Sequence, residues 1–305
     1  MKKRILTVLG IVLICVGLLC PLYSYANPPL DPDAKASLVL HYQKEEKTFE
    51  GLTVSIYRVA EAHSNGTFEL IEPYASYPIR IHDITAQEQW KTTAATLTAY
   101  IAANQLPATR QGTTDATGTV SFDQLQTGLY LVSDVYTEDN SGSYLFSQFM
   151  VYLPTPNEDG TYDYSVEANP KCISYVPSQE YRVTKLWQDT GKVSERPKEV
   201  TIDLYKDGVL QDTQTLSAAN NWTYTWYASV EDLGVWTVLE RSVEDRYTVT
   251  IKQNGNVFTV INTHQYNEDP PVKTGDSFSP MPWILAIAFS GLGLMLLGAR
   301  GRKFR

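Results

Sequence analysis

The 305-residue chain is poor in the residues that build disulfides, metal centres and nucleic-acid sites. It has 3 cysteines and 4 scattered histidines, and its 34 acidic residues outnumber 25 basic ones. Only Cys172 lies outside the predicted leader, which excludes an intramolecular disulfide. The sequence has no Gly-rich phosphate loop, HExxH motif or Ser-His-Asp signature. We therefore expect no metal, no cofactor, no nucleic-acid partner and no enzyme activity toward other molecules.

The first residues have the pattern of a secretory signal peptide. Three basic residues precede an apolar run, 5–19, and Ser24 and Ala26 occupy the small-residue positions that a signal peptidase needs. A first membrane anchor is the alternative, but the run is short for a span. We predict a signal peptide at 1–26, cleaved after Ala26, followed by a linker at 27–36.

The other end of the chain has the pattern of a membrane span followed by a basic tail. An apolar stretch at 283–299 is about long enough to span a bilayer, and a basic tail at 300–305 would stay in the cytoplasm. Losing both ends, with seven basic residues and Asp276, would lower the formal net charge from −9 to −15. Such an acidic chain is suited to remaining soluble outside the cell.

Between the ends, short alternating runs rich in Val, Thr and Tyr predict an all-β fold. Examples are "LTVSIYRV" at 52–59 and "EVTIDLYKDG" at 199–208, each bounded by turn residues. "TVSIYR" at 53–58 is echoed by "TIDLYK", and "GLYLVSD" at 128–134 by "GVWTVLE". These echoes predict two tandem Ig-like β-sandwiches, at 37–174 and 181–264, joined by a linker at 175–180.

One helix interrupts the first predicted sandwich. Thr85 and Glu88 are placed as a capping box, and Pro107 follows the segment. An apolar stripe at helical spacing predicts a face packed on the sandwich, and its members are Trp90, Ala94, Leu97 and Ile101.

The segment 181–264 opens with "YRVTKLW", contains "WTVLE" and closes with "FTVINTH". It resembles the collagen-adhesin B-type (Cna-B) domains of Gram-positive surface proteins. In that family a lysine on the first strand and an asparagine on the last form a spontaneous amide cross-link, assisted by a buried acid. The resemblance assigns these roles to Lys185, Asn262 and Glu240.

Strand alternation agrees with this assignment, because Val183, Lys185 and Trp187 share one face. Burial would keep the Lys185 amine neutral and nucleophilic, and would keep Glu240 protonated, able to donate a hydrogen bond to the Asn262 carbonyl. The alternative is a Lys185–Glu240 salt bridge or a lysine that reaches solvent from a strand edge.

The first predicted sandwich resembles the pilin-type domains of the same family but lacks the nucleophile. His41 lies near the position of Lys185, with Tyr42 beside it, and Asp134 is the counterpart of Glu240. Lys35 and Lys44 lie at other strand positions, so we expect no internal cross-link here and a structural role for His41.

A second lysine lies at the end of this sandwich, in "YDYSVEANPKC". The segment resembles the pilin motif of sortase-assembled shaft subunits at Tyr162, Val166, Pro170 and Lys171, and departs from it at Ala168 and Asn169. In such proteins the lysine is the acceptor that joins one subunit to the next. A solvated lysine at a strand end is the alternative.

The linker 265–282 contains "DPPVKTGD", which resembles a cell-wall sorting signal. Thr274 and Gly275 supply the bond that a sortase would cleave, and the preceding positions are Pro271, Val272 and Lys273 in place of Leu-Pro-X. A plain linker before a permanent anchor is the alternative.

Together these features predict an exported, sortase-anchored pilin-like subunit of the cell wall. Its partners would be sortase, peptidoglycan or other pilin subunits, and the membrane through its C-terminal segment before sorting. The alternative is a monomeric wall-anchored adhesin for a host or matrix ligand, with binding loops in 74–114 and 136–144.

Overall fold

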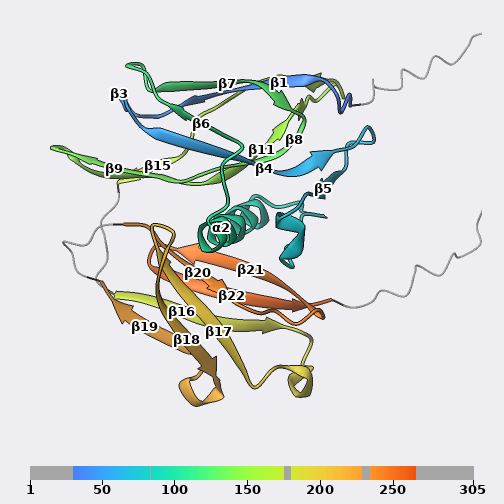
Figure 1. Cartoon of the computed structure of the whole chain (residues 1–305), viewed down its shortest axis with the longest axis vertical. Coiled ribbons are helices and arrows are strands. Elements are labelled where there is room, and N and C mark those ends of the chain that lie inside the picture. Colours follow the sequence, from blue (N-terminus) through green and yellow to red (C-terminus); the bar gives the residue numbers. More distant parts are fainter. Residues whose placement is uncertain (1–29, 83, 175–179, 229–233, 266–305) are drawn as a thin grey trace, which may run out of the picture. The chain divides into compact units, whose positions relative to one another are not determined.

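In the computed structural model, the described residues are 30–82, 84–174, 180–228 and 234–265. They are mostly β-strand with a single long helix, as the sequence predicted (Figure 1). The predicted signal peptide, sorting signal, membrane span and basic tail all lie outside the described residues. Among the described residues, no helix is both long and apolar enough to cross a membrane.

The strands from 35 to 174 pair only with one another and are called here the N-terminal β-region. Its main sheets have the orders β14-β1-β7, β15-β10-β9 and β11-β8-β4-β5, with β6 also pairing with β4. The strands are β1 (Lys35–His41), β2 (Gln43–Lys44), β3 (Lys47–Thr48), β4 (Thr53–Ala62), β5 (Phe68–Leu70), β6 (Arg110–Thr113), β7 (Thr119–Gln126), β8 (Gly128–Val132), β9 (Val135–Asp139), β10 (Gly142–Phe146), β11 (Phe149–Leu153), β12 (Thr155–Pro156), β13 (Tyr162–Asp163), β14 (Ser165–Ala168) and β15 (Cys172–Ser174). β1 begins inside the predicted linker 27–36, and Leu30 is already buried.

The strands from 180 to 264 form the C-terminal β-region, with sheet orders β19-β16-β22-β21 and β18-β17-β20. Its first strand, β16, runs parallel to its last, β22. The strands are β16 (Glu180–Gln188), β17 (Glu199–Lys206), β18 (Val209–Ser217), β19 (Thr223–Tyr227), β20 (Trp236–Glu240), β21 (Tyr247–Asn254) and β22 (Val257–His264).

In each β-region two layers of strands face each other across an apolar core, the arrangement of an Ig-like sandwich. In the C-terminal β-region, Val183 and Val260 of one sheet share a core with Ile202 and Val238 of the other. In the N-terminal β-region, Leu38 and Val54 likewise come from facing sheets. Each fully buried Val, Leu or Ile side chain contributes about 1.5–3 kcal/mol, so these inward rows hold the sheets together.

The sequence echoes between the two β-regions correspond to equal strand registers. Ile56 of β4 lies opposite Val132 of β8, and the matching residues Leu204 of β17 and Val238 of β20 lie opposite each other. The strand pairings therefore repeat. The division into two tandem domains stays a prediction, because residues up to Gln265 form one compact unit and one core cluster includes residues of both β-regions.

The helix, α2 (Gln87–Asn104), fulfils the prediction of one helix between β5 and β6. Its stripe residues Ala94, Leu97 and Ile101 are buried, and Trp90 packs against Tyr152 of β11. The buried surface is wider than the stripe and includes Thr93, Ala95, Thr96, Ala99 and Tyr100. This wide surface arises because α2 contacts β11 and β8 as well as β20 and β21 of the C-terminal β-region.

The predicted capping box at the start of α2 is wrong. The N-cap residue is Ala86, and the side-chain carbonyl of Gln89 accepts hydrogen bonds from the backbone N–H groups of Thr85 and Ala86, at 3.0 and 2.9 Å. Glu88 instead faces outward and pairs with Lys252 of β21 at 2.9 Å. Gln89, one residue after the predicted Glu88, therefore accepts from the free backbone N–H groups at the start of the helix, which would otherwise lack an intrahelical partner.

Candidate cross-link site

Lys185 points into the core of the C-terminal β-region, as strand alternation predicted. Along β16, Val183 and Lys185 are buried and Trp187 is partly buried, whereas Leu186 is 48% exposed. The Lys185 side chain is 2% exposed, and its Nζ donates to the carbonyl oxygens of Leu186 and Val260 at 2.8 and 3.4 Å. It also lies 4.0 Å from the centre of the Trp187 ring.

Asn262 reaches the same core from the neighbouring strand. In the parallel β16–β22 ladder, Lys185 lies opposite Val260 and Trp187 opposite Asn262. Phe258, Val260 and Asn262 alternate inward along β22, and Asn262 is 1% exposed. The period of two therefore places the lysine and the asparagine on the same buried face, two positions apart in register.

Glu240 comes from the facing sheet, at the end of β20, and is also 1% exposed. Its Oε1 accepts a hydrogen bond from Asn262 Nδ2 at 3.0 Å, and its Oε2 lies 3.8 Å from Lys185 Nζ. The structure therefore brings together all three residues that the sequence assigned to this site.

Burial shifts both ionisable groups toward their neutral forms. Loss of solvation lowers the pKa of Lys185 to about 8, with Arg196 acting in the same direction and Glu240 opposing it. Loss of solvation also raises the pKa of Glu240, against the opposing influences of Lys185 and Asn262. A neutral amine and a protonated carboxyl are the forms that amide-bond formation requires.

The hydrogen bond at Asn262 differs in direction from the expected one. We expected Glu240 to donate to the Asn262 carbonyl, but here the Asn262 amide group donates to Glu240. Within the described part of the chain, Asn262 Oδ1 and Glu240 Oε2 have no hydrogen-bond partner. Each buried unpaired polar atom costs about 1–3 kcal/mol, so this arrangement holds unused bonding capacity beside the amine.

Sequence reasoning did not identify an ion pair beside the site. Asp189, buried just after β16, accepts from Arg196 Nε and Nη2 at 2.5 and 2.8 Å. The guanidinium also lies 5.8 Å from the Trp187 ring centre. The two charges of this pair act on Lys185 in opposite directions, since Arg196 lowers the pKa of the amine and Asp189 raises it. The two residues lie in a loop and have no local pattern that would have revealed them.

Sequence reasoning also missed a contact from the N-terminal β-region. The Tyr77 hydroxyl, in the loop before α2, donates to the backbone carbonyl of Glu240 at 3.0 Å. The next residue, Pro78, accepts from the backbone N–H of Val249 at 3.0 Å, and Val249 lies directly opposite Asn262 in the β21–β22 ladder.

In the N-terminal β-region, the position of Lys185 is taken by Tyr42, one residue after His41. The Tyr42 N–H donates to Gly118 O just before β7, as the Lys185 N–H donates to Trp222 O just before β19. Tyr42 is fully buried, whereas His41 is partly exposed and its Nδ1 lies 3.1 Å from Thr119 Oγ1. The expectation that His41 lies near this position is thus corrected by one residue.

Asp134 faces this tyrosine as Glu240 faces the lysine. Burial raises the pKa of Asp134 to about 6, and the pKa of Tyr42 is also raised, by burial and by Asp134. Lys35 is exposed, and the Lys44 amine bonds the Ser174 hydroxyl. Neither lysine takes the position of a nucleophile at this site.

Lys171 lies between β14 and β15 and is exposed, and its backbone carbonyl accepts from Ser147 N at 2.9 Å. The neighbouring motif residues Val166 and Pro170 are buried, so the backbone is held while the amine faces solvent. Tyr162 lies in β13. Cys172 is partly buried and has no disulfide partner among the described residues.

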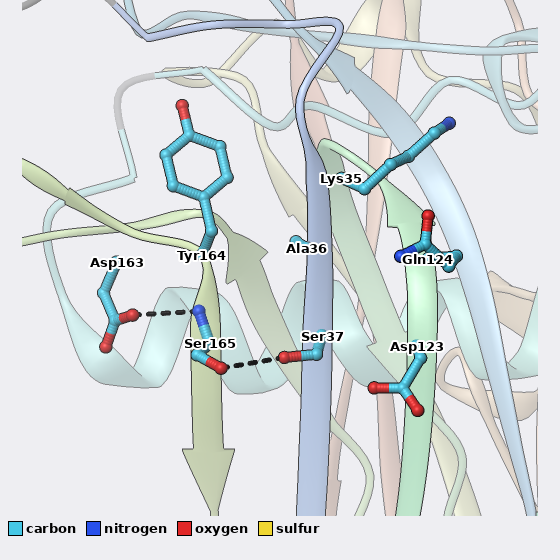
Figure 2. A pocket seen from close by; sticks show the side chains of 8 residues that line it. All are labelled: Lys35, Ala36, Ser37, Asp123, Gln124, Asp163, Tyr164 and Ser165. Carbon is cyan, nitrogen blue, oxygen red and sulfur yellow. Dashed lines mark hydrogen bonds between the residues drawn. The ribbon is translucent and has the colours of Figure 1, made fainter.

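Figure 2 shows a shallow hollow beside β1, β7 and β14, well separated in sequence from the residues of the cross-link site. The Ser37 and Ser165 hydroxyls lie 3.0 Å apart across it. It is lined by Lys35, Ala36, Ser37, Asp123, Gln124, Asp163, Tyr164 and Ser165. On the β4–β5 hairpin, Glu61, His63 and Glu69 place ligand atoms within 4.8 Å of one another, all at least partly exposed.

Comparisons with known proteins show similarity to one family in the C-terminal β-region. Residues 181–263 match the family model of the Cna protein B-type domain. The collagen adhesin of Staphylococcus aureus is 32% identical over 128 residues, which is 39% of this chain and 11% of that protein.

Among solved structures, one B repeat unit (B1) of the S. aureus collagen-binding surface protein aligns over 76% of this chain and 99% of its own, at 16% identity and a TM-score of 0.27. The major pilin SpaD of Corynebacterium diphtheriae aligns over 77% of this chain and 65% of its own, at 17% identity and a TM-score of 0.32. The family match includes Lys185, Glu240 and Asn262. Residues 181–263 of this chain are therefore similar to Cna protein B-type domains.

Proposed function

We propose that Lys185 and Asn262 form an intramolecular isopeptide bond, with Glu240 as the proton carrier. The observation that carries this proposal is the burial of all three residues together, with Glu240 within 3.0 Å of the Asn262 amide and 3.8 Å of the Lys185 amine. Buried charged residues are normally paired, so a plain salt bridge remains the competing arrangement. It would leave the Asn262 carbonyl unpaired in the core.

The reaction exchanges one amide for another. Lys185 Nζ attacks Cγ of Asn262, the Cγ–Nδ2 bond breaks, and Nδ2 leaves as ammonia after taking the proton that Nζ loses. Glu240 lies between both nitrogens, so its carboxyl can pass that proton from one to the other. A half-turn of the Asn262 carboxamide would bring its unpaired Oδ1 to the protonated carboxyl, which then polarises the carbonyl.

Proximity of the two groups and exclusion of water would accelerate this reaction, because free amines and amides in water do not react with each other at a useful rate at ambient temperature. The two reacting groups project from adjacent strands, so the ladder holds them in place.

The intact mass of a chain that contains residues 27–275 tests this proposal. A folded chain of residues 27–275 should be lighter than its sequence by one ammonia, and Lys185→Arg should have the unmodified mass. An unmodified mass for the wild-type chain would establish the salt bridge instead.

The bond would make the C-terminal β-region a mechanical unit. It joins the first strand to the last, so nearly the whole region becomes one closed loop. For a loop of this size, chain-entropy arguments give about 4–5 kcal/mol of stabilisation. Such a cross-link would help the C-terminal β-region to resist mechanical force and proteolysis without disulfide bonds.

We further propose that the chain is a wall-anchored, pilin-like structural subunit and a sortase substrate. The support is the order of sequence features around the Cna B-type domain: a predicted signal peptide, Thr274–Gly275, an apolar span and a basic tail. Lys171 is the proposed acceptor, and its solvent-facing amine on a held backbone suits attack on a bound thioester.

Boiled wall extracts in detergent test this second proposal. A subunit that polymerises gives a ladder of covalent multimers that is lost in Lys171→Ala, with Lys44→Ala as the matched control. A single band in all three strains would instead indicate a monomeric protein.

A monomeric adhesin is the second candidate function, favoured by the similarity to a collagen adhesin. The helix-bearing part of 74–114 is an unsuitable binding surface, because α2 is largely buried between the two β-regions. The β9–β10 hairpin, 136–144, keeps exposed residues at its turn. Binding of collagen or fibrinogen by residues 27–275, lost on altering that turn, would support this function.

A further inference from the structure

We infer that Tyr77 positions Glu240 for cross-linking, so that the N-terminal β-region completes the reaction site of the C-terminal one. This inference rests on the proposed isopeptide bond. It concerns a residue outside 181–263, the segment that matches the Cna B-type family model.

The C-terminal sandwich has an open side at the level of the site. β20 is the edge strand of one sheet and β21 is the edge strand of the other. Edge strands leave backbone groups unpaired, and water at those groups would reach the carboxyl beside them. A site that depends on burial needs this side to be closed.

The segment before α2 closes it. Tyr77 donates to the carbonyl oxygen of Glu240 on β20, and Pro78 accepts from the N–H of Val249 on β21, each at 3.0 Å. Val249 is the ladder partner of Asn262. Two consecutive residues therefore bond both sheets, one at the strand that carries the acid and the other at β21, the strand paired with the one that carries the asparagine.

Further contacts hold this segment in place. The Tyr77 ring stacks on Tyr100 of α2, with centroids 4.9 Å apart, and the Tyr100 hydroxyl donates to Pro73 O at 3.0 Å. Thr96 Oγ1 accepts from the N–H of Ile251 at 2.8 Å, one more edge position along β21. Tyr77, Leu97 and Ile101 belong to the same core cluster as Val238 and Ile251.

Tyr77 thus acts on the reaction through Glu240 and without touching the reacting atoms. Holding the end of β20 fixes the carboxyl between both nitrogens, and excluding water favours its protonated form. The pKa of Tyr77 itself is raised well above its usual range by burial and by Glu240. The other titratable groups that act on Tyr77 are Tyr100 and Tyr205, and Lys185 acts on Glu240.

The test is the rate of ammonia loss in residues 27–275, followed by intact mass after cell-free synthesis is stopped. Tyr77→Phe keeps the ring and removes the hydroxyl. It should slow the reaction about fivefold, the rate equivalent of one hydrogen bond of about 1 kcal/mol. The matched control, Tyr130→Phe, removes the hydroxyl of a buried tyrosine that donates to the backbone carbonyl of Gln126 at 2.8 Å and belongs to the other core cluster, and it should react at the wild-type rate.

A pH profile separates positioning from plain destabilisation. Without the Tyr77 hydroxyl, Glu240 should be more hydrated, and its pKa should be lower. In Tyr77→Phe, the acid limb of the plot of reaction rate against pH should therefore lie at lower pH, and the plateau of the rate should be lower. In an Asn262→Ala background, which cannot cross-link, both tyrosine variants should lose similar stability in urea. Equal rates and equal acid limbs for Tyr77→Phe and Tyr130→Phe would overturn the inference, while ammonia loss in the wild type would still support the bond. Failure of the wild type to lose ammonia would overturn the proposed function first.

Discussion

Asn262 Nδ2 donates a 3.0 Å hydrogen bond to Glu240 Oε1, and this bond crosses from one sheet of the C-terminal sandwich to the other. The asparagine lies beside the buried strand that carries Lys185, whereas the glutamate ends an edge strand of the facing sheet. A single contact thus links the amide that would be consumed to the acid that would carry the proton.

Glu240→Gln should abolish ammonia loss while keeping the fold. The glutamine has nearly the same shape and can still accept from Asn262, but it cannot carry a proton between the two nitrogens. Intact mass should equal that of the unmodified variant sequence, with circular dichroism unchanged. Leu186→Gln, on the exposed side of β16, is the control and should cross-link fully. Cross-linking at the wild-type rate in Glu240→Gln would exclude the acid from the mechanism.

Lys185→Met should make the C-terminal β-region easier to unfold and to digest. The change removes the bond and its loop closure, worth about 4–5 kcal/mol, and partly offsets that loss by replacing a buried amine with an apolar chain. Thermal unfolding and thermolysin digestion measure the difference. Asn262→Ala is the comparison, since it removes the same bond and keeps the amine. If both variants melted with the wild type, the chain would owe no stability to a cross-link.

Leu97→Ala should destabilise the packing of α2 by about 2–5 kcal/mol, because Leu97 is fully buried in a core shared with both β-regions. Urea unfolding monitored by tryptophan fluorescence should show the change. Lys91→Ala on the exposed side of the same helix is the control and should alter stability by less than about 0.5 kcal/mol.

Much of the cross-link site followed from local pattern, because a strand has a period of two. Once Val183 and Trp187 were assigned to the core, Lys185 had to share their face, and the burial of β16 agrees. The repeated strand register follows from the same kind of evidence, since side chains that face one core recur at matching places. Such signals lie within a few neighbouring residues.

The contact between the two β-regions that sequence reasoning missed joins distant parts of the chain. Tyr77 lies more than a hundred residues from Glu240, and only tertiary packing brings them together. The sequence also could not show whether His41 or Tyr42 takes the position that corresponds to Lys185. Neighbouring residues on a strand differ only in the face they occupy, and the hydrogen bond of Tyr42 to Gly118 identifies Tyr42 as the counterpart. At the helix start, Glu88 and Gln89 are neighbours with similar side chains, and the local sequence does not show which one points back to the N-cap. Gln89 bonds the Ala86 N–H, because Glu88 points toward Lys252 of β21.

The stability of the N-terminal β-region should fall as pH rises from about 4 to above 6, because of Asp134. Burial raises its folded-state pKa to about 6, above the unfolded value of about 3.9. Between these values the folded state keeps the proton and the unfolded state releases it, so unfolding becomes easier as pH rises. Below the lower value both states are protonated, and above the higher one the destabilisation is complete.

Asp134→Asn should remove this dependence, because an amide cannot titrate. It should stabilise the region by about 1–2 kcal/mol at neutral pH, less than the full shift implies, since Asp134 keeps some solvent contact. Urea unfolding at pH 4, 5, 6 and 7, in a Lys185→Met background so that no cross-link interferes, measures both effects. Asp123→Asn, on the exposed side of β7, is the matched control and should leave the pH dependence in place. An equal pH dependence in the Asp134→Asn variant would show that another group is responsible.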